Sequence, residues 1–368
     1  MTDDRFSPLH QLHVDGGASF TDFAGWQMPV SYGSDLAEHH AVRTAAGIFD
    51  ISHMAEIEVT GSDAASFLDF ALAGRLSAIA EGQAKYSLLL DEAGGIVDDL
   101  VVYRRGPESF FVVANAGNRA AVVSALGVRT AGFTDLAVAD RSDEIALIAV
   151  QGPASRAILD ATEGLDVSLA ELKYYWSTDA TFDDVPVLVG RTGYTGEDGF
   201  ELYIETAKAE ALWRALLEAG APLGLIPAGL ASRDTLRLEA GMPLYGHELG
   251  LDSFAVQAGL GRVVNLNKEH DFVGKAAAIA GPPANARTLV GLTTEGRRAG
   301  RAGYPVVDDR GLTVGIITSG ALSPTLGYPV AMAYVDPGAT DSPLFIDVRG
   351  TRIAASVVSL PFYKRVAN

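Results

Sequence analysis

Two stretches near the middle of the chain combine residue types that bind ligands. The first, Arg191–Glu201, carries a tyrosine, three glycines and several acids within one irregular segment. The second, Gly229–Glu239, carries two arginines among acids on an expected helix. A planar guanidinium can bind a carboxylate through two parallel hydrogen bonds, and an aromatic ring offers a face to a flat ligand. Because a fold needs neither pattern, the two stretches predict a pocket for a flat, nitrogen-rich ligand that ends in carboxylates.

The first stretch is longer than a simple turn between its flanking strands, which are expected at 187–191 and 200–204. A hairpin loop needs only about two to five residues, and the glycines permit tight or left-handed backbone. Glu201, near the start of the second strand, can accept N–H donors, and Tyr194 offers a ring face. The alternative is an ordinary hairpin whose loop carries polar side chains without a function, but the length of the segment favours a binding site.

Arg233, Asp234 and Arg237 fall on one stripe of the expected helix, since residues four apart are neighbours on a helical surface. They are either ion pairs on a wet face, worth only about a few tenths of a kcal/mol, or a guanidinium fork for a ligand carboxylate. A further basic residue, Arg365, follows the apolar segment 360–363. This apolar segment predicts that the C-terminal tail docks and brings Arg365 to a site.

Two adjacent aspartates, Asp98 and Asp99, stand at the start of a strand that follows the glycine turn 91–95. Because side chains alternate along a strand, one should point inward and the other to solvent. An aspartate-rich turn is a common structure, yet aspartate has a poor propensity for strands. These residues alone leave both interpretations open.

Composition excludes several classes of chemistry. The 368 residues include no cysteine, which excludes disulfides, thiolate nucleophiles and cysteine-bound metal clusters. The formal net charge of −18 argues against nucleic-acid binding, which needs clustered basic residues. His39 and His40 are adjacent on a helix and cannot face one ligand, so no metal site is expected. The charged N-terminus and the lack of a long apolar run predict a cytoplasmic protein without a membrane span.

Hydrophobic periodicity predicts alternating helices and antiparallel strands, which is an α+β class. After a boundary at 281–287, short strands separated by turns, with no helix, predict a small β-barrel or jelly roll. The helices are expected from Ser34 to Gly47, after Ser62, and at 119–126, 153–161 and 208–219, and the strands at 54–60, 86–90, 100–103 and 110–114.

Seven motifs resemble, in order and spacing, those of the glycine cleavage system T-protein family. The resemblance implies a three-domain cloverleaf of antiparallel sheets with flanking helices. Its folate-binding region, 1–280, would contain two interleaved domains, roughly 1–55 with 225–280 and 56–224, and a C-terminal barrel would span 285–366. The motifs are Phe23–Tyr32, Phe49–Met54, the turn before Asp98 and Asp99, Arg191–Glu201, Gly229–Leu249, Thr318–Gly327 and Pro361–Arg365.

The resemblance also implies a ligand and roles for particular residues. Members bind tetrahydrofolate as a co-substrate, without a metal, at the centre of the cloverleaf. The carboxylate corresponding to Asp99 lies beside the reacting folate nitrogens and is the expected catalytic group. The expected folate-binding residues are Tyr86 and Tyr194 flanking the pterin, Glu201 accepting its N–H groups, Arg233 and Arg365 near the folate, and Asn115 beside the same pocket.

The implied reaction is aminomethyl transfer. The aminomethyl group arrives on the dihydrolipoyl arm of the lipoylated H-protein, and the products are 5,10-methylenetetrahydrofolate, ammonia and the free dithiol arm. Loss of ammonia leaves an electrophilic carbon that folate nitrogens attack without a protein nucleophile. A buried carboxylate such as Asp99 can stabilise positive charge and relay a proton.

Two other functions are alternatives. A related tetrahydrofolate-dependent demethylase would act on a small methylated amine or sulfonium compound. A non-enzymatic folate-binding relative is disfavoured because its cysteine-containing motif is replaced here by Arg-Thr-Gly-Tyr at 191–194. The chain departs from the family at Arg262, where an aromatic residue is common.

Overall fold

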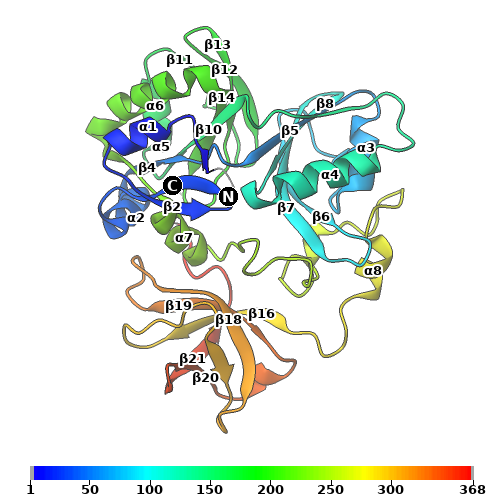
Figure 1. Cartoon of the computed structure of the whole chain (residues 1–368), viewed down its shortest axis with the longest axis vertical. Coiled ribbons are helices and arrows are strands. Elements are labelled where there is room, and N and C mark those ends of the chain that lie inside the picture. The colour runs from blue at the N-terminus through cyan, green and yellow to red at the C-terminus, as the bar shows by residue number, and fades with distance from the viewer. Residues whose placement is uncertain (1–3, 366–368) are drawn as a thin grey trace.

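The computed structural model describes residues 4–365, whose strands form three sheets and a closed barrel. Figure 1 shows two sheet-and-helix parts side by side above the barrel. The predicted α+β class, with two interleaved parts and a C-terminal barrel, is confirmed. Among the described residues, no helix is long and apolar enough to cross a membrane.

The largest sheet has seven strands, and one of its inner strands, β4, comes from the N-terminal part of the chain. β4 is buried along its whole length because it lies between β10 and β15 and has apolar cores on both faces. α5 (Ser155–Ala161) and α6 (Thr206–Gly220) pack on one face. The strand order is β11 (Leu165–Asp166), β12 (Ser177–Phe182), β13 (Val185–Gly190), β14 (Gly199–Glu205), β10 (Ile145–Gln151), β4 (Ala46–Asp50) and β15 (Leu225–Pro227).

A second sheet of five strands is inserted in the sequence between β4 and β10. α3 (Ala64–Ala71) and α4 (Arg119–Arg129) contribute apolar side chains to the core on one of its faces. All of its strand pairs are antiparallel. The strand order is β6 (Ala84–Leu90), β7 (Ile96–Gly106), β8 (Ser109–Ala114), β5 (Ala55–Thr60) and β9 (Ala137–Asp140).

The two large sheets pack against each other through aromatic side chains. Tyr103 and Phe111 of the five-stranded sheet meet Tyr203 of the seven-stranded sheet, with ring centroids 5.8 and 5.3 Å apart. Aromatic pairs at such distances add roughly 0.5–1.5 kcal/mol to the free energy gained by burial. The contact fixes β7 relative to β14, the two strands that carry Asp99 and Glu201.

The N-terminal segment adds a small sheet and the helix α2. Ser34 caps α2, as predicted, because its side chain accepts a hydrogen bond from Ala37 N at 3.2 Å. α2 packs against α7, which lies between the sheets and the barrel in Figure 1. The elements are β1 (Arg5–Phe6), α1 (His10–Asp15), β2 (Ser19–Phe23), β3 (Trp26–Ser31), α2 (Asp35–Thr44) and α7 (Leu230–Glu239).

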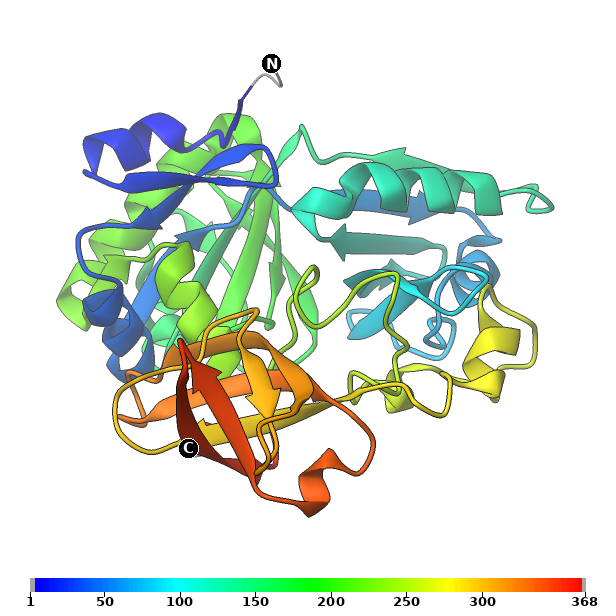
Figure 2. The same ribbon diagram turned by 60° about the horizontal axis from the view of Figure 1, so that its bottom comes forward.

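A long irregular segment, residues 240–287, leads to the barrel and contains one short α-helix, α8 (Lys275–Ala280). Figure 2 shows this segment, in yellow-green to yellow, running below the five-stranded sheet. Arg262 is exposed within it, so the departure from the family pattern falls on the surface. β16 pairs with both β19 and β21, which closes the barrel. The barrel order is β16 (Thr288–Thr294), β19 (Pro329–Val335), β18 (Thr313–Leu322), β17 (Pro305–Val307), β20 (Leu344–Val348) and β21 (Thr351–Val358).

Two predicted helix boundaries are wrong. The helix that was expected to close at Gly47 ends at Thr44, because Gly47 pairs in β4 with Gln151 of β10. Ser62 does not cap α3, since its hydroxyl donates instead to the Asp135 carboxylate at 2.7 Å.

The sheets also divide the chain differently from the predicted subdomain at 56–224. Strands β10 to β14, which fall within that range, pair in one sheet with β4 and β15, which lie outside it. Strand pairing joins segments that are distant in sequence, so hydrophobic periodicity within each strand does not reveal it.

Candidate functional site

Asp98 and Asp99 lie near the start of β7 and are held by amide and hydroxyl donors. Asn115, which follows β8, donates through Nδ2 to Asp98 Oδ1 at 2.8 Å and to Asp99 Oδ1 at 2.9 Å. Asn118 donates to Asp98 Oδ1 at 2.6 Å, and Tyr86 Oη donates to Asp99 Oδ2 at 2.9 Å. Asp98 is the inward residue, fully buried, and Asp99 is half-buried on the opposite face. The Asn115 amide therefore orients both carboxyl groups.

Burial makes ionisation of both aspartates unfavourable. It raises the pKa of Asp99, although the hydrogen bonds from Tyr86 and Asn115 lower it. Burial and the neighbouring charge of Asp99 raise the pKa of Asp98 to about 7. A carboxyl group whose pKa lies near 7, as that of Asp98 does, can hold or release a proton near neutral pH, which is what general acid–base chemistry requires.

The glycine-rich segment between β13 and β14 folds against Gln151 at the end of β10. Gln151 Nε2 donates to Thr192 O at 3.1 Å. A Cβ atom on Gly193 or on Gly199 would collide with the Gln151 side chain. Glycine at these positions leaves room for the Gln151 side chain, and Gln151, which no sequence motif indicated, holds the segment in place.

Tyr194 of this segment pairs with Arg233 of α7. The Tyr194 hydroxyl donates to Pro243 O at 2.5 Å, and the Arg233 guanidinium lies 5.0 Å from the centroid of the tyrosine ring. Within residues 4–365, the buried Nη1 of Arg233 has no hydrogen-bond partner. Burial lowers the pKa of Arg233. A buried guanidinium nitrogen without an acceptor is costly, so this atom indicates a place where a ligand supplies one.

Glu201 lies in β14 and is half-buried. Its Oε2 accepts a hydrogen bond from Thr192 Oγ1 at 2.6 Å and a weak one from Tyr103 Oη at 3.5 Å. A carboxylate offers about four acceptor positions. Glu201 is therefore held in place by Thr192 and keeps acceptor capacity for the N–H groups of a ligand.

Tyr175, which no sequence motif indicated, lies near these groups. Burial raises the pKa of Tyr175, and the neighbouring groups Tyr174, Glu201 and Asp99 raise it further. Its φ of 60° is unfavourable for an aromatic residue, and a hydrogen bond from Tyr175 N to Arg191 O at 3.0 Å holds it. The aromatic run 174–176 was the available signal in the sequence.

The predicted site residues influence one another's pKa values, which is consistent with one cluster. Burial is the main cause that raises the pKa of Tyr86 and of Tyr194, and the charge of Asp99 adds to it at both. Glu201 opposes the effect of burial on the pKa of Arg233. The structure thus brings together Asp99, two tyrosines, Glu201 and Arg233, which come from β6, β7, β14, α7 and the segment before β14.

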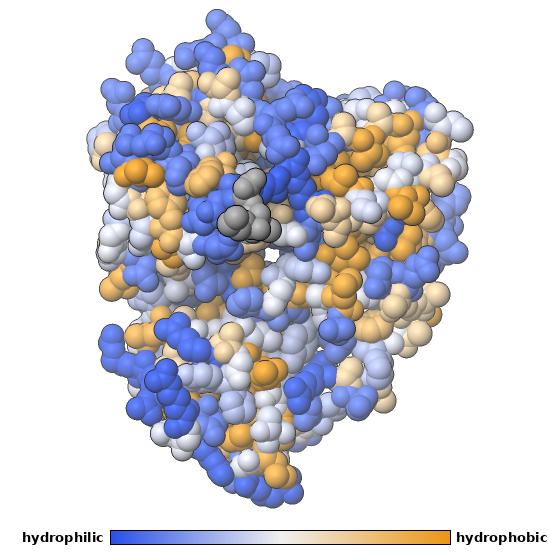
Figure 3. All heavy atoms as spheres, viewed as in Figure 1, coloured by the Kyte–Doolittle hydropathy of each residue, from blue (hydrophilic) through white to orange (hydrophobic). Residues whose placement is uncertain are grey.

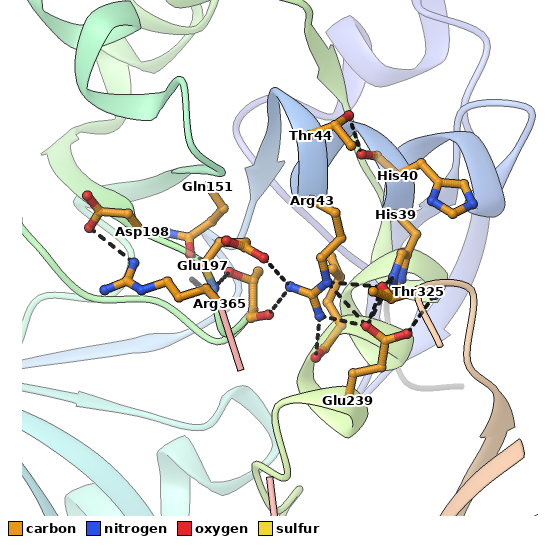
Figure 4. A network of polar contacts seen from close by, with 12 residues as sticks. His39, His40, Arg43, Thr44, Gln151, Glu197, Asp198, Glu239, Thr325 and Arg365 are labelled. Carbon is orange, nitrogen blue, oxygen red and sulfur yellow. Dashed lines mark hydrogen bonds and ion pairs between the residues drawn. The ribbon is translucent and has the colours of Figure 1, made fainter. Parts of the chain in front are cut away.

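The two remaining arginines are placed differently. Arg237 is fully buried and donates to Glu248 Oε2 at 3.1 Å and to Ser319 Oγ at 2.8 Å, so it ties α7 to the barrel. Arg365 lies 3.6 Å from the Asp198 carboxylate (Figure 4) and 5.7 Å from the ring centroid of Tyr174. The tail docks, as predicted, against the glycine-rich segment that precedes β14.

Two hollows on the molecule lie elsewhere. One of about 770 Å³ is lined by residues of β12 to β14 and of the five-stranded sheet, and one of about 350 Å³ lies at α8. Neither is lined by a predicted site residue. We place the candidate site at the cluster, because the unpaired Arg233 nitrogen and the carboxyl group of Asp99, which Tyr86 and Asn115 orient, lie there. Figure 3 shows a small opening near the centre of the face, where the three parts meet.

The described residues contain no group of three or more histidine, aspartate or glutamate side chains that could hold a metal ion. The donors and acceptors of the cluster fit an organic ligand better. A flat heterocycle with N–H groups matches Glu201, and an acidic ligand group matches Arg233.

Comparison with known proteins gives a consistent result along the chain. Residues 9–268 match the family model of the GCVT N-terminal domain, and residues 287–364 match that of the Glycine cleavage T-protein C-terminal barrel domain. The chain is 56% identical over 373 residues to an aminomethyltransferase of Cutibacterium acnes, covering 99% of this chain and 100% of that protein. It is 54% identical to one of Streptomyces avermitilis, covering 98% of each. The crystal structure of glycine cleavage system aminomethyltransferase T from Bartonella henselae superposes with a TM-score of 0.90 at 38% identity, over 98% of both chains.

Proposed function

The chain belongs to the glycine cleavage T-protein family, and we propose that its site performs aminomethyl transfer to tetrahydrofolate. The donor is the aminomethyl group on the dihydrolipoyl arm of the lipoylated H-protein. The products are 5,10-methylenetetrahydrofolate, ammonia and the free dithiol arm. The observation that carries this proposal is the half-buried Asp99, oriented by Tyr86 and Asn115 within the same cluster as Tyr194, Glu201 and Arg233.

The residues of the cluster fit a reduced folate. Glu201 accepts ring N–H groups, the faces of Tyr86 and Tyr194 flank the pterin, and the buried Nη1 of Arg233 gains an acceptor from the ligand. Arg365 lies beside Asp198 at the other end of the glycine-rich segment, where its guanidinium can bind an acidic group of the folate. The partial burial of these groups reduces their contact with water, which strengthens each polar contact.

Asp99 is the catalytic group in this proposal. When bound, tetrahydrofolate supplies two nitrogens that accept the one-carbon unit. Asp99 stabilises positive charge that develops nearby and relays a proton, while Tyr86 and Asn115 hold its two oxygens. Asp98, whose pKa is raised to about 7, keeps a second carboxyl group close to Asp99 and opposes its ionisation when it is itself charged. No protein nucleophile is required.

The partner and the compartment are expectations from the family. H-protein carries the aminomethyl donor on its dihydrolipoyl arm in this proposal, and the cytoplasmic location stays a prediction from the sequence. The demethylase alternative differs in its donor, so the same site residues would serve it and the choice of substrate separates the two.

One assay tests the function. Aminomethylated H-protein is mixed with the protein, and ammonia release is measured with and without tetrahydrofolate. We expect release that depends on both the protein and the folate. Sarcosine, dimethylglycine and a sulfonium methyl donor serve as controls. Turnover of one of these donors, with no release from aminomethylated H-protein, would instead support the demethylase.

A further inference from the structure

A buried arginine outside the proposed folate cluster joins four separate parts of the chain. Arg43, in the last turn of α2, has a side chain that is only 4% exposed. It donates to Glu197 Oε1 at 3.0 Å and to Thr195 O at 2.7 Å, both in the glycine-rich segment before β14. It also donates to Glu239 Oε2 at 2.8 Å, at the end of α7 (Figure 4).

Glu239 extends these contacts to the barrel. Its carboxylate accepts hydrogen bonds from Thr325 N at 3.0 Å and Thr325 Oγ1 at 2.7 Å, in the loop between β18 and β19. Ser323 of the same loop donates to Oε1, the oxygen that also accepts from Thr325 N. His39, one turn before Arg43 on α2, lies 3.2 Å from Glu239 Oε2. The carboxylate is 1% exposed, so these bonds replace water almost completely.

The C-terminal tail is attached at the same place. The Arg43 guanidinium lies 4.1 Å from the centroid of the Tyr363 ring, and Tyr363 N donates to the backbone oxygen of Glu239 at 2.8 Å. Two residues further on, Arg365 pairs with Asp198. We call the group of Arg43, Glu197, Glu239, Thr325 and Tyr363 the Arg43 junction.

The junction borders the residues that the proposed function uses without including them. Thr195 is the neighbour of Tyr194 in the chain, Glu239 ends the helix that carries Arg233, and Tyr363 anchors the tail that carries Arg365. A shift of the junction therefore moves three folate-binding residues relative to one another. Misplacing binding groups by about 1 Å can change rates by about a hundredfold.

We infer that Arg43 is a positioning residue for the folate, which sets the tyrosine segment, α7 and the C-terminal tail in register around the ligand. This inference rests on the proposed function. It adds that the barrel takes part in ligand binding through the loop between β18 and β19 and through the tail. Folate affinity then depends on residues that do not contact the folate.

Mild variants test the inference in the full-length protein. Glu197→Gln keeps the size of the side chain but removes one ion pair to Arg43, and Tyr363→Leu removes the ring beneath the guanidinium. The dissociation constant for tetrahydrofolate is measured by calorimetry, together with the urea midpoint of each variant. We expect each variant to weaken binding about tenfold while remaining folded, because a displaced junction moves the folate-binding residues out of position. Arg214→Gln, which breaks an exposed ion pair with Glu210 on α6, is the matched control and should leave the dissociation constant unchanged.

A double-mutant cycle separates positioning from general stability. Arg365→Gln should weaken folate binding about tenfold in the wild-type background and less than about twofold in the Tyr363→Leu background, since a tail that is no longer held cannot present Arg365. Equal effects of Arg365→Gln in both backgrounds, or wild-type affinity of both mild variants, would overturn the inference while the function stands. Absence of saturable tetrahydrofolate binding by the wild-type protein would reject the proposed function, and the inference with it.

Discussion

Two buried polar regions lie a short distance apart on α7 and differ in how completely their charges are paired. In the Arg43 junction, one guanidinium and one carboxylate share ion pairs and hydrogen bonds with four parts of the chain. In the proposed folate cluster (Tyr86, Asp99, Tyr194, Glu201 and Arg233), the buried Nη1 of Arg233 has no partner within residues 4–365, and Asp99 has a raised pKa. A network of fully paired charges stabilises one arrangement of the chain, whereas unpaired polar groups and perturbed pKa values are typical of a ligand-binding site.

The same contrast occurs on a single helix. Arg237 is one turn from Arg233 and binds Asp234, Glu248 and Ser319, while Arg233 faces Tyr194. Arg237 therefore stabilises the fold, whereas Arg233 is available for a ligand. Substitution of Arg237 should lower stability, and substitution of Arg233 should weaken ligand binding.

The largest expected effect is at Arg237. Arg237→Met should lower the free energy of unfolding by about 3–5 kcal/mol, because it leaves the buried Glu248 carboxylate without its partner. Arg233→Met should change that free energy by less than about 1 kcal/mol, since it removes a buried charge that has an unpaired nitrogen. Urea unfolding followed by circular dichroism measures both. Equal losses in the two variants would contradict the contrast.

Asp99 should matter for turnover more than for folding. Asp99→Asn is expected to lower kcat by about a hundredfold or more, as removal of a general acid–base group does. The Asn side chain can accept from Asn115 Nδ2 through its one oxygen and donate through its NH2 group to the Tyr86 hydroxyl, so the fold should persist. Asp166→Asn, at an exposed position of β11, is the control. Wild-type turnover by the Asp99 variant would reject its catalytic role.

The Arg43 junction should give the protein an acid-sensitive stability. Burial opposes ionisation of Glu239, but hydrogen bonds and charge from His39, Ser323 and Arg43 outweigh it and lower the pKa from 4.5 to about 2. The stabilisation is complete above pH 4.5, where the unfolded state is also ionised, and is lost as the pH falls towards 2. The loss is about 3 kcal/mol by linkage.

Urea unfolding between pH 6 and about pH 2.5 checks this prediction. Glu239→Gln should show a flatter pH dependence than the wild type over the acidic part of the range. Glu210→Gln, which changes an exposed glutamate, should follow the wild type. A Glu239 variant with the full wild-type slope would show that other carboxylates carry the acid sensitivity.

A smaller effect than at Asp99 or in the Arg43 junction is expected at Glu201. Glu201→Gln should weaken tetrahydrofolate binding by roughly 1–3 kcal/mol, because a charge-assisted hydrogen bond becomes a neutral one. Thr192 can still donate to the glutamine oxygen, so the side chain should stay in place. Titration calorimetry at constant pH measures the difference, and an unchanged affinity would count against the contact.

Local patterns were sufficient for most elements but not for their pairing. Short strands separated by turns, with no helix, predicted the C-terminal barrel, and Ser34 predicted the start of α2. The sequence did not reveal that β4 pairs with β10, because strand partners are chosen by long-range packing. The same reason explains the wrong boundary at Gly47, which looked like a helix end and lies in a buried strand.

The site shows a similar division. Glycine spacing and adjacent acids led to Asp99, Tyr194 and Glu201, which the structure places in one cluster, although their roles stay predictions. Helical spacing put Arg233 and Arg237 on one stripe, and it could not tell which of them finds buried partners. The sequence did not predict Tyr175 as a site residue, because its position depends on a left-handed backbone conformation that the pattern of side chains does not indicate.

The pairing of Ile48 in β4 with Val150 in β10 has a consequence for biosynthesis. β4 leaves the ribosome about a hundred residues before its neighbour exists, with the whole five-stranded sheet emerging in between. During that interval the mostly apolar strand β4 has an unpaired edge, which favours aggregation with other nascent chains. We expect expression yield to depend on chaperones that shield this strand until β10 has been translated.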